Sequence, residues 1–411
     1  MTVFEIIAVI LSVAAIGGYI NYRYIGFPPT IGHMAFALLL SVLAIFAGSM
    51  GWFDLDAARA VVNSIDFSEV VLHGLLSYLL FAGALHIRLD DLKSVKWAVG
   101  SLATIGVVMA TFLIGTLIWW AAQWMGLPMP YVYALLFGAL ISPTDPIAVL
   151  SILKEAGASK SLSTKVGGES LFNDGVGVVL FLAILSAANN PDHFEVSHVL
   201  LAFVEEGMGG LLLGGVLGWI TYCLLRSIDD YKVEVLLTIA LVTGGYALAE
   251  ALHISAPLCM VAAGLIIGNQ GRAHGMSDTT RQHIDVFWEL VDEVLNAVLF
   301  LLIGLEILIV TLSSHTVQLG LIAIPIVLLA RFVSVGLPVT VMRFFQAFDK
   351  GTVRLLTWGG LRGGLSIAMA LSLPAGPEKP VILTMTYIVV LFSIFVQGLT
   401  FKRSIAYIMK R

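Results

Sequence analysis

One stretch of the sequence, Gly167–Gly175, carries two carboxylates, a hydroxyl and an amide at helical spacing. Ser170 and Asp174 lie four residues apart and share one face of a helix. Glu169 and Asn173, also four apart, occupy the neighbouring stripe. Such hard oxygen ligands suit an alkali cation and do not suit soft metals. We therefore expect Asp174 to bind a monovalent cation; a polar packing seam, the alternative, does not need two carboxylates.

A second stretch, Ser142–Pro146, places Thr144 and Asp145 between two prolines. Proline has no N–H, so the carbonyls one turn earlier lose their helical partners. A break of this kind within a membrane is tolerated only where it is buried in protein or lines a cavity. The freed carbonyls and Thr144 can coordinate a cation. A proline kink that serves packing alone is the alternative, but Asp145 stands at the break itself.

A third stretch, Trp358–Gly364, surrounds Arg362 with four glycines, which weaken a helix and let backbones approach closely. Arg331 lies in another apolar segment. Neither arginine loses its proton readily, so each needs a carboxylate partner when it is buried. Glu169 and Asp145 are the candidates, and the sequence leaves the pairing open. A buried ion pair would explain why Glu169 need not bind the cation itself.

The rest of the chain consists of apolar segments that must position these residues. Of the 411 residues, 59% are hydrophobic and only 12% are charged, about half the ~25% that is usual in a soluble domain. This composition excludes an ordinary soluble enzyme, a disordered chain and a partner of nucleic acid. A β-barrel requires alternating segments of about ten residues, and the sequence shows none. The chain is therefore predicted to be an all-α polytopic membrane protein that acts within the lipid bilayer.

Thirteen apolar spans are predicted, because about 20 apolar residues cross a bilayer as a helix. Their approximate limits are 2–22, 31–50, 67–87, 97–124, 131–152, 164–189, 198–225, 233–252, 255–270, 288–311, 317–342, 353–374 and 380–401. The first span carries Glu5 and lacks a preceding basic region, so we expect it to be retained rather than cleaved as a signal peptide. The hydrophilic loops are too short to fold alone, so residues 1–411 are expected to form a single transmembrane domain.

Basic residues indicate the orientation of these spans. Arg59 and Lys379 fall on one side, and Arg331 and Arg362 fall within spans. Every other one of the 22 lysines and arginines falls on the loops of the opposite side. Cytoplasmic loops carry such an excess of positive charge. We therefore expect the N-terminus outside and the C-terminus in the cytoplasm.

The two interrupted spans, 131–152 and 353–374, are seven spans apart and therefore run in opposite directions. Each is the fourth span of a five-span unit. Interrupted helices at matching places in inverted halves point to a transporter's binding site at the midplane of the membrane. Asp174 lies about ten residues into its span, ~15 Å along the helix and near the middle of a ~30 Å hydrocarbon core. The sequence thus predicts inverted repeats whose two interrupted helices cross at the midplane.

Four stretches, in order, resemble the monovalent cation:proton antiporter family, in the electroneutral Asn-Asp branch that contains the bacterial NhaP-type sodium/proton antiporters. They are Ser142-Pro143-Thr144-Asp145-Pro146, Gly168-Glu169-Ser170-Leu171-Phe172-Asn173-Asp174-Gly175, Phe300-Leu301-Leu302-Ile303-Gly304-Leu305-Glu306 and Gly359-Gly360-Leu361-Arg362-Gly363. The resemblance implies the thirteen-span sodium/proton antiporter fold and a homodimer in a bacterial inner (cell) membrane. It also implies a core, approximately residues 97–189 and 317–401, that moves against a dimerisation domain, approximately residues 2–87 and 198–311.

The resemblance further implies what the site residues do. Asp174 alternately holds a cation or a proton, with Asn173 and Ser170 beside it. Thr144 is a ligand through its backbone or side chain, so that Na⁺ is held by Asp174, Ser170 and Thr144. No cofactor is expected beyond the transported Na⁺ and H⁺. The polar core also holds a structural ion pair of Glu169 with a buried arginine, Arg331 or Arg362. Asp145 lies in the same polar core and is expected to belong to the cation- and proton-binding residues.

One departure from the family concerns the third span. Many relatives have Phe-Glu-Gly-Ala there, and the glutamate joins the ion site, whereas this chain has Phe81-Ala82-Gly83-Ala84. Ala82 cannot coordinate a cation, so the cation selectivity of the relatives does not carry over. Na⁺ is the expected cation, with Li⁺ and K⁺ as alternatives.

The expected function is secondary active exchange of this cation for H⁺ by alternating access, in pH and sodium homeostasis. Deprotonated Asp174 binds the cation, the loaded core swings, and a proton displaces the cation outside. One proton against one monovalent cation moves no net charge against the membrane potential. Rival hypotheses are a potassium/proton antiporter, an ion channel, an intramembrane aspartyl protease using Asp145 and Asp174, and an organic-anion transporter. The sequence shows no repeated selectivity filter, and we expect a transporter rather than an enzyme.

Weaker signals come from ionisable residues outside these stretches. His73 is expected to be a hydrogen-bonded structural histidine, with a proton relay as the alternative. A further group is expected to line a water-filled funnel or to lie at the membrane interface: Glu250, His253, Glu289, Asp292, Glu293 and Glu306.

Overall fold

The computed structural model describes residues 2–52, 54–63, 66–145, 149–150, 153, 160–189, 196–308, 313–344, 348 and 351–409. Within these ranges the chain is almost entirely helical, and a single isolated backbone bridge pairs Asp145 with Leu361. The α-helices are α1 (Val3–Ile20), α2 (Pro29–Ser49), α3 (Leu55–Asn63), α4 (Phe67–Glu69), α5 (Leu76–Leu85), α6 (Leu89–Ser101), α7 (Val107–Trp124), α8 (Tyr131–Ile141), α10 (Lys160–Asn189), α11 (Val196–Arg226), α12 (Tyr231–Ala251), α13 (Ala256–Ile266), α14 (Asp278–Leu305), α15 (Ser314–Met342), α16 (Thr352–Trp358), α17 (Gly364–Leu371), α18 (Glu378–Phe392) and α19 (Leu399–Met409). Shorter turns of π or 3-10 type continue several of them: η1 (Asn21–Ile25), η2 (Val70–Leu75), η3 (Leu102–Gly106), η5 (Ile267–Gly275), η6 (Glu306–Leu308) and η7 (Ser393–Gly398).

Each predicted span falls on helix in the described residues, so the all-α prediction is confirmed. Nine helical segments of this part of the chain are long and apolar enough to cross a membrane. The other four predicted spans do not reach the required length and hydropathy, each for a local reason. Spans 131–152 and 353–374 are broken, 255–270 ends in the polar η5, and 288–311 carries three carboxylates within α14.

Several boundaries differ from the prediction; for example, α6 begins at Leu89, before the predicted start at 97. The loop near residues 51–66 contains the short helix α3. α14 begins at Asp278, ten residues before the predicted span. Ser277 caps this helix, because its hydroxyl accepts the backbone N–H of Thr280 at 3.3 Å. The first turns of α14 are polar, so the hydropathy pattern does not reveal them.

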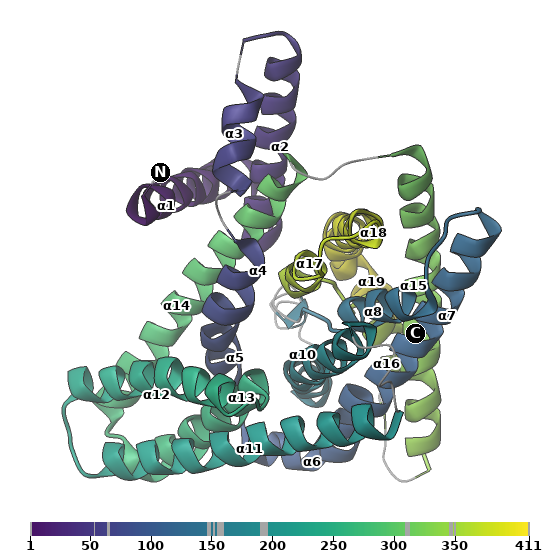
Figure 1. The fold of residues 1–411 in the computed structure, drawn as a ribbon. Coiled ribbons are helices and arrows are strands. Elements are labelled where there is room, and N and C mark those ends of the chain that lie inside the picture. Colours follow the sequence, from purple (N-terminus) through teal and green to yellow (C-terminus); the bar gives the residue numbers. More distant parts are fainter. Residues whose placement is uncertain are drawn as a thin grey trace.

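The helices form two packed groups with α5 and α14 along the boundary (Figure 1). In one group, α11 packs against α12 and α13, α13 packs against α5, and α14 packs against α2 and α5. In the other group, α7 packs against α8 and α15, α15 against α18, and α10 against α6 and α8. Small residues permit the closest approaches: a Cβ at Gly138 of α8 would collide with the carbonyl oxygen of Thr111 in α7.

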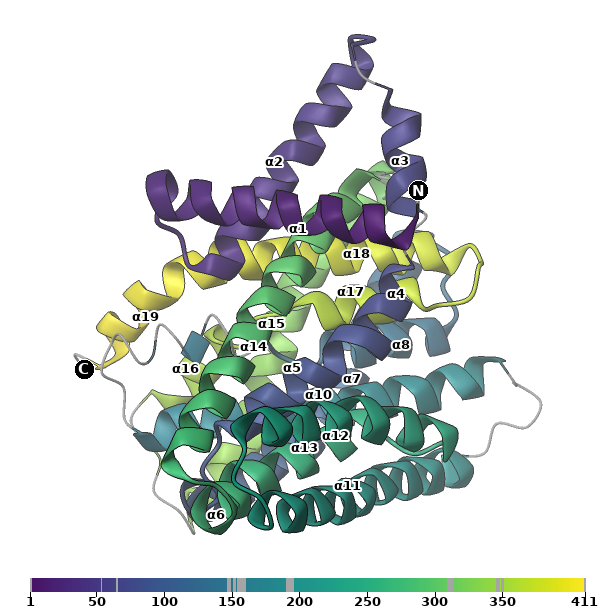
Figure 2. The same cartoon turned by 90° about the vertical axis from the view of Figure 1, so that its left-hand side faces the viewer.

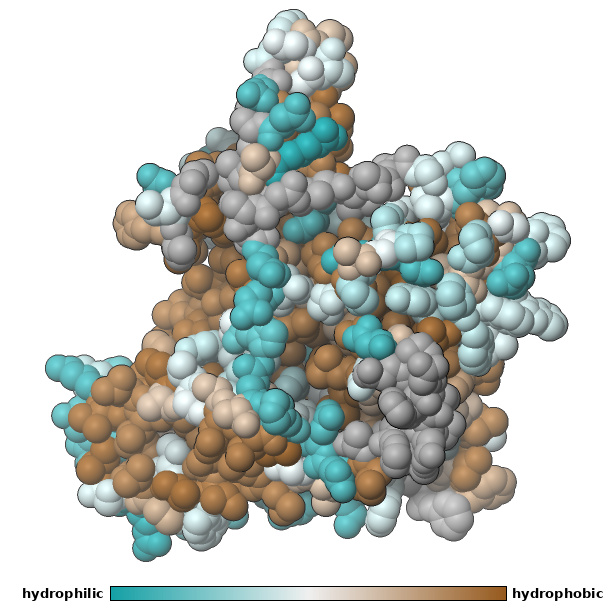
Figure 3. Space-filling model, viewed as in Figure 1, coloured by the Kyte–Doolittle hydropathy of each residue, from teal (hydrophilic) through white to brown (hydrophobic). Residues whose placement is uncertain are grey.

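The outer surface is apolar where the spans face outward. Figure 3 shows hydrophobic side chains over α11, α12 and α13, and large side chains such as Leu212 and Leu236 are 65% and 62% exposed. An extended apolar surface of this kind suits contact with lipid. In Figure 2 the N-terminal end of α1 and the C-terminal end of α19 lie on opposite sides of the molecule. An odd number of spans produces this arrangement.

Candidate cation-binding site

The two interrupted spans meet at a backbone contact. One break follows α8, and the other separates α16 from α17. The backbone N–H of Asp145 donates to the carbonyl oxygen of Leu361 at 2.8 Å, in antiparallel orientation. This bond satisfies a donor and an acceptor that the broken helices leave without helical partners. The predicted crossing of the broken segments is therefore present, although Pro146 lies outside the described residues.

Arg362 binds the carbonyl end of α8. Its Nη1 donates to the carbonyl oxygens of Ser142 and Pro143, both at 2.8 Å. Its backbone N–H donates to Ser393 Oγ at 2.9 Å, and the residue is 2% exposed. The guanidinium thus neutralises the negative end of the helix dipole. The sequence predicts freed carbonyls that can bind a cation, and one of them, that of Ser142 one turn before Pro146, binds this side chain instead.

Arg331 pairs with Glu169. Its Nη1 and Nη2 donate to Oε1 and Oε2 of Glu169 at 2.6 and 2.8 Å. Its Nε donates to the carbonyl oxygen of Leu356 at 3.3 Å. The two charged side chains are 6% and 2% exposed, so each depends on the other for the solvation that water would otherwise provide. The pair joins α10, α15 and α16, and it assigns the partner that the sequence leaves open.

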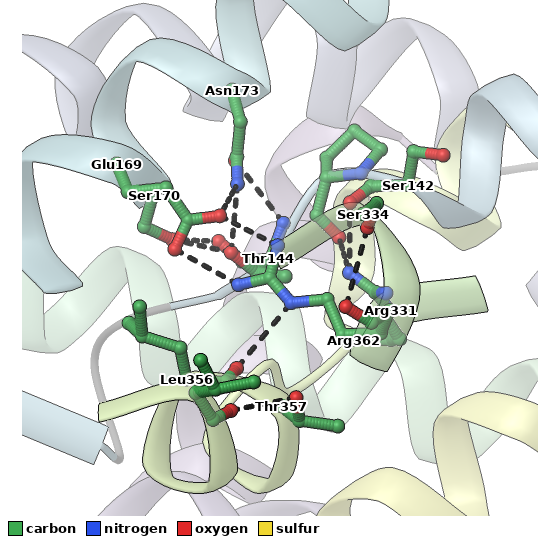
Figure 4. A network of polar contacts seen from close by, with 12 residues as sticks. Ser142, Thr144, Glu169, Ser170, Asn173, Arg331, Ser334, Leu356, Thr357 and Arg362 are labelled. Atoms are coloured by element: carbon green, nitrogen blue, oxygen red, sulfur yellow. Dashed lines mark hydrogen bonds and ion pairs between the residues drawn. The ribbon is translucent and has the colours of Figure 1, made fainter. Parts of the chain in front are cut away.

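Asn173 ties the break after α8 to α10 (Figure 4). Its Oδ1 accepts the backbone N–H of Thr144 at 3.2 Å. Its Nδ2 donates to Thr144 Oγ1 at 2.8 Å and to Glu169 Oε1 at 3.2 Å. The hydroxyl of Ser170 lies 3.1 Å from Thr144 Oγ1 and also donates to the Thr144 carbonyl. The carbonyl and hydroxyl oxygens of Thr144 therefore lie beside the hydroxyl of Ser170, and Ser170 precedes Asp174 by one turn of α10.

Asp174 lines a cavity of about 650 Å³ together with Thr144 and Asp145. Its side chain is partly exposed. In the part of the chain that the structure describes, no hydrogen bond reaches its carboxylate. The charges that act on it are those of Asp145, Glu169 and Arg362. An ionisable group placed this way within a membrane bundle is available to an ion or a proton that enters the cavity.

Residues 10–406 match a known protein family, described as "Sodium/hydrogen exchanger, transmembrane". The chain belongs to the sodium/hydrogen exchanger family. It is 50% identical over 401 residues to the Na(+)/H(+) antiporter NhaP of Pseudomonas aeruginosa, across 96% of this chain and 95% of that protein. It is 38% identical over 356 residues to the Na(+)/H(+) antiporter NhaH of Halobacillus dabanensis, across 84% of this chain and 85% of that protein.

The fold of this exchanger is similar to that of the sodium proton antiporter MjNhaP1 from Methanocaldococcus jannaschii. The TM-score is 0.78 over 100% of both chains, at 18% sequence identity. At this identity the likeness establishes the fold, and the predicted sodium/proton antiporter fold is confirmed. The family and the apolar helices together make the chain an integral, multi-pass membrane protein.

The exchanger's cavity has an acidic wall on α14. Apart from Leu299, the lining residues from this helix are carboxylates and one amide: Asp285, Glu289, Asp292, Glu293 and Asn296. The predicted funnel lining by Glu289, Asp292 and Glu293 is confirmed, whereas Glu306 is buried in η6. Asp285 and Asn296 are absent from the sequence-based prediction. Residues 285, 289, 292 and 296 follow the three-and-four spacing of one helix face, a signal that could have revealed both.

Ala82 occupies the wall that α5 contributes. It is 1% exposed and lines the cavity together with Gly83 and His86. A glutamate at this position would stand in the same cavity as Asp174. In this exchanger α5 has no acidic residue, and α14 provides the carboxylates that face the cavity in addition to Asp145 and Asp174.

His73 bridges η2 and α12. Its Nδ1 lies 2.9 Å from Glu69 and its Nε2 lies 3.1 Å from Glu250. The predicted hydrogen bonding of this histidine is confirmed. η2 and α12, which His73 connects, both pack against α5. Neither Glu69 nor Glu250 lines the Asp174 cavity.

Proposed function

We propose that the protein is a secondary active antiporter that exchanges Na⁺ for H⁺, with Asp174 as the group that holds either ion. The different surroundings of two carboxylates on α10 support this assignment. Glu169 is bound by both terminal nitrogens of Arg331. Asp174 faces the cavity without a hydrogen bond from any described residue. Only the second carboxylate can exchange a cation for a proton without breaking a buried ion pair.

Competition at one carboxylate couples the two fluxes. Deprotonated Asp174 holds Na⁺, and a proton that binds the same oxygens displaces it. Either ion neutralises the carboxylate, whereas the empty charged form is costly to enclose away from water. The loaded forms therefore cross and the empty form does not, which produces exchange instead of leak. One proton against one Na⁺ leaves the cycle without net charge movement.

We assign Asp174, Ser170 and Thr144 as the Na⁺ ligands. The support is the cluster of oxygens around the break, where the Ser170 hydroxyl lies 3.1 Å from that of Thr144. Asn173 positions Thr144 through bonds to both its backbone N–H and its hydroxyl. Asp145, which follows Thr144 and lines the same cavity, adds negative charge near these oxygens.

The proposed moving core comprises approximately residues 97–189 and 317–401, and residues 2–87 and 198–311 form the dimerisation domain of a homodimer. Two observations support this division. The Glu169–Arg331 pair and the contacts of Arg362 join helices of the first set to one another. The Asp174 cavity is lined by both sets, so a displacement between them would open or close it.

The proposed orientation has the N-terminus outside and the C-terminus in the cytoplasm of a bacterial inner membrane. It rests on the basic residues, nearly all of which fall on loops of one side. The cavity extends to His86 and Asp285 near those loops, and Asp285 pairs with Arg272 there. In this orientation the cavity opens to the cytoplasm.

Exchange by Asp174→Asn in proteoliposomes tests the proposal. Wild-type protein should dissipate an imposed pH gradient when Na⁺ is added, and the variant should not. Asp56→Asn is the matched control, because Asp56 has the same charge and a side chain that is 93% exposed on α3. Exchange by Asp174→Asn at the wild-type rate would contradict the assignment. Parallel additions of Li⁺ and K⁺ establish the selectivity, and a preference for K⁺ would make the protein a potassium/proton antiporter.

A further inference from the structure

We propose that a groove between α15, α16 and α19 binds the headgroup of an anionic phospholipid. The groove has a volume of about 480 Å³, within the ~300–1,000 Å³ of small-molecule sites. Phe332 of α15, Arg354 and Trp358 of α16 and Arg403 of α19 form its walls. It shares no lining residue with the Asp174 cavity, so it is a separate site.

Of the polar side chains in the groove, the two arginines are the ones that a charged ligand can pair with. The hydroxyl of Thr357 donates to the Val353 carbonyl at 2.7 Å, and Trp358 Nε1 donates to Thr400 Oγ1 at 3.1 Å. These donors are therefore engaged within the protein. Arg354 and Arg403 are exposed, and neither forms an ion pair with a residue that the structure describes.

A guanidinium group donates hydrogen bonds, accepts none and stays charged. A ligand that satisfies Arg354 and Arg403 together must therefore bring several acceptor oxygens and negative charge. A phosphate group meets both requirements and binds arginine through paired hydrogen bonds. The two arginines come from different helices, so a single phosphate between them would join α16 to α19.

Apolar surface beside the arginines selects a lipid over free phosphate. Phe332, which lines the groove, is 50% exposed. Val396 and Leu399, which are 41% and 39% exposed, lie within one helical turn of the lining residue Thr400 along the chain. On a membrane-spanning chain such side chains face acyl chains, and a soluble anion would leave them unused. Trp358 adds the amphipathic ring that is typical of the membrane interface. Basic pockets between spans on the cytoplasmic side bind anionic headgroups, and both arginines lie on the side that carries the basic loops.

The groove lies against α16, the first half of the broken twelfth span. The carbonyl of Leu356 in α16 accepts Arg331 Nε at 3.3 Å, and the carbonyl of Trp358 accepts Gln397 Nε2 at 3.0 Å. A lipid that joins α16 to α19 would therefore brace the helix that supports the Glu169–Arg331 pair. We expect it to stabilise the fold whether or not Asp174 can bind an ion.

Native mass spectrometry and thermal unfolding of the full-length protein in neutral detergent test this site. Phosphatidylglycerol should bind and raise the melting temperature, and phosphatidylcholine and inorganic phosphate should not. Arg354→Gln/Arg403→Gln should weaken phosphatidylglycerol binding by on the order of tenfold for each guanidinium removed. Arg226→Gln/Arg343→Gln removes two exposed arginines elsewhere and should bind as wild type does.

Three results would overturn the proposal: equal binding of phosphatidylcholine, an equal shift with inorganic phosphate alone, or an equal loss in the control pair. Ser404→Trp provides a second test, because it fills the groove and keeps both arginines. It should lose phosphatidylglycerol as the double variant does, and normal binding would contradict the site. Asp174→Asn should bind this lipid normally, so the result does not depend on the transport mechanism.

Discussion

Replacing Arg331 by methionine should destabilise the protein far more than breaking a surface ion pair does. Glu169 would lose donors at 2.6 and 2.8 Å while its side chain stays 2% exposed. Removing one partner of a buried pair costs about 3–5 kcal/mol. Glu169 would keep the Asn173 bond at 3.2 Å and could take up a proton, so we expect the lower value, about 3 kcal/mol. Glu169→Met should cost about 5 kcal/mol, because Arg331 cannot be neutralised.

Reversible unfolding in detergent, followed by tryptophan fluorescence, measures these differences. The double variant Glu169→Met/Arg331→Met should cost less than the sum of the single changes, because neither charge is then left alone. Arg281→Gln is the control: it breaks a 3.0 Å pair with Asp278 whose side chains are 37% and 96% exposed, and it should cost less than about 1 kcal/mol. Equal losses for Arg331→Met and Arg281→Gln, or strict additivity in the double variant, would refute the reasoning.

Four further changes test other parts of the site. Asn173→Ala removes hydrogen bonds worth about 1 kcal/mol each, so melting temperature and exchange rate should both fall. Asp292→Asn removes a cavity carboxylate and should raise the KM for Na⁺ about twofold at low ionic strength, with little effect in high salt. Ala82→Glu adds a carboxylate to the cavity and should lower that KM. Gly138→Val would push against the Thr111 carbonyl and should cost about 1–3 kcal/mol in unfolding measurements.

The spans and both breaks could be predicted because their causes are local. Apolar length sets a span, and a proline or a glycine cluster weakens a helix wherever it occurs. The spacing of Ser170 and Asp174 likewise places them on one face before any packing is known. The polar start of α14 escaped prediction, because its cap at Ser277 and its acidic turns carry no apolar signal.

The roles of the two buried arginines could not be separated from the sequence. Arg331 and Arg362 both lie in apolar segments, and both could have paired with Glu169. Their partners depend on how distant helices pack: Arg331 reaches α10 from α15, whereas Arg362 lies against the end of α8. The spacing of the acidic residues on α14 is visible in the sequence, but only packing places Asp285 in the same cavity as Asp174.

The competition of Na⁺ and H⁺ for Asp174 is tested most directly by exchange rates in proteoliposomes. Initial rates should be measured against Na⁺ concentration at several pH values, with equal pH on both sides at the start. A single shared carboxylate predicts that the apparent KM for Na⁺ rises as pH falls, approaching about tenfold per pH unit, while the maximal rate at saturating Na⁺ is retained. A constant KM with a falling maximal rate would place the proton at another group and contradict the account.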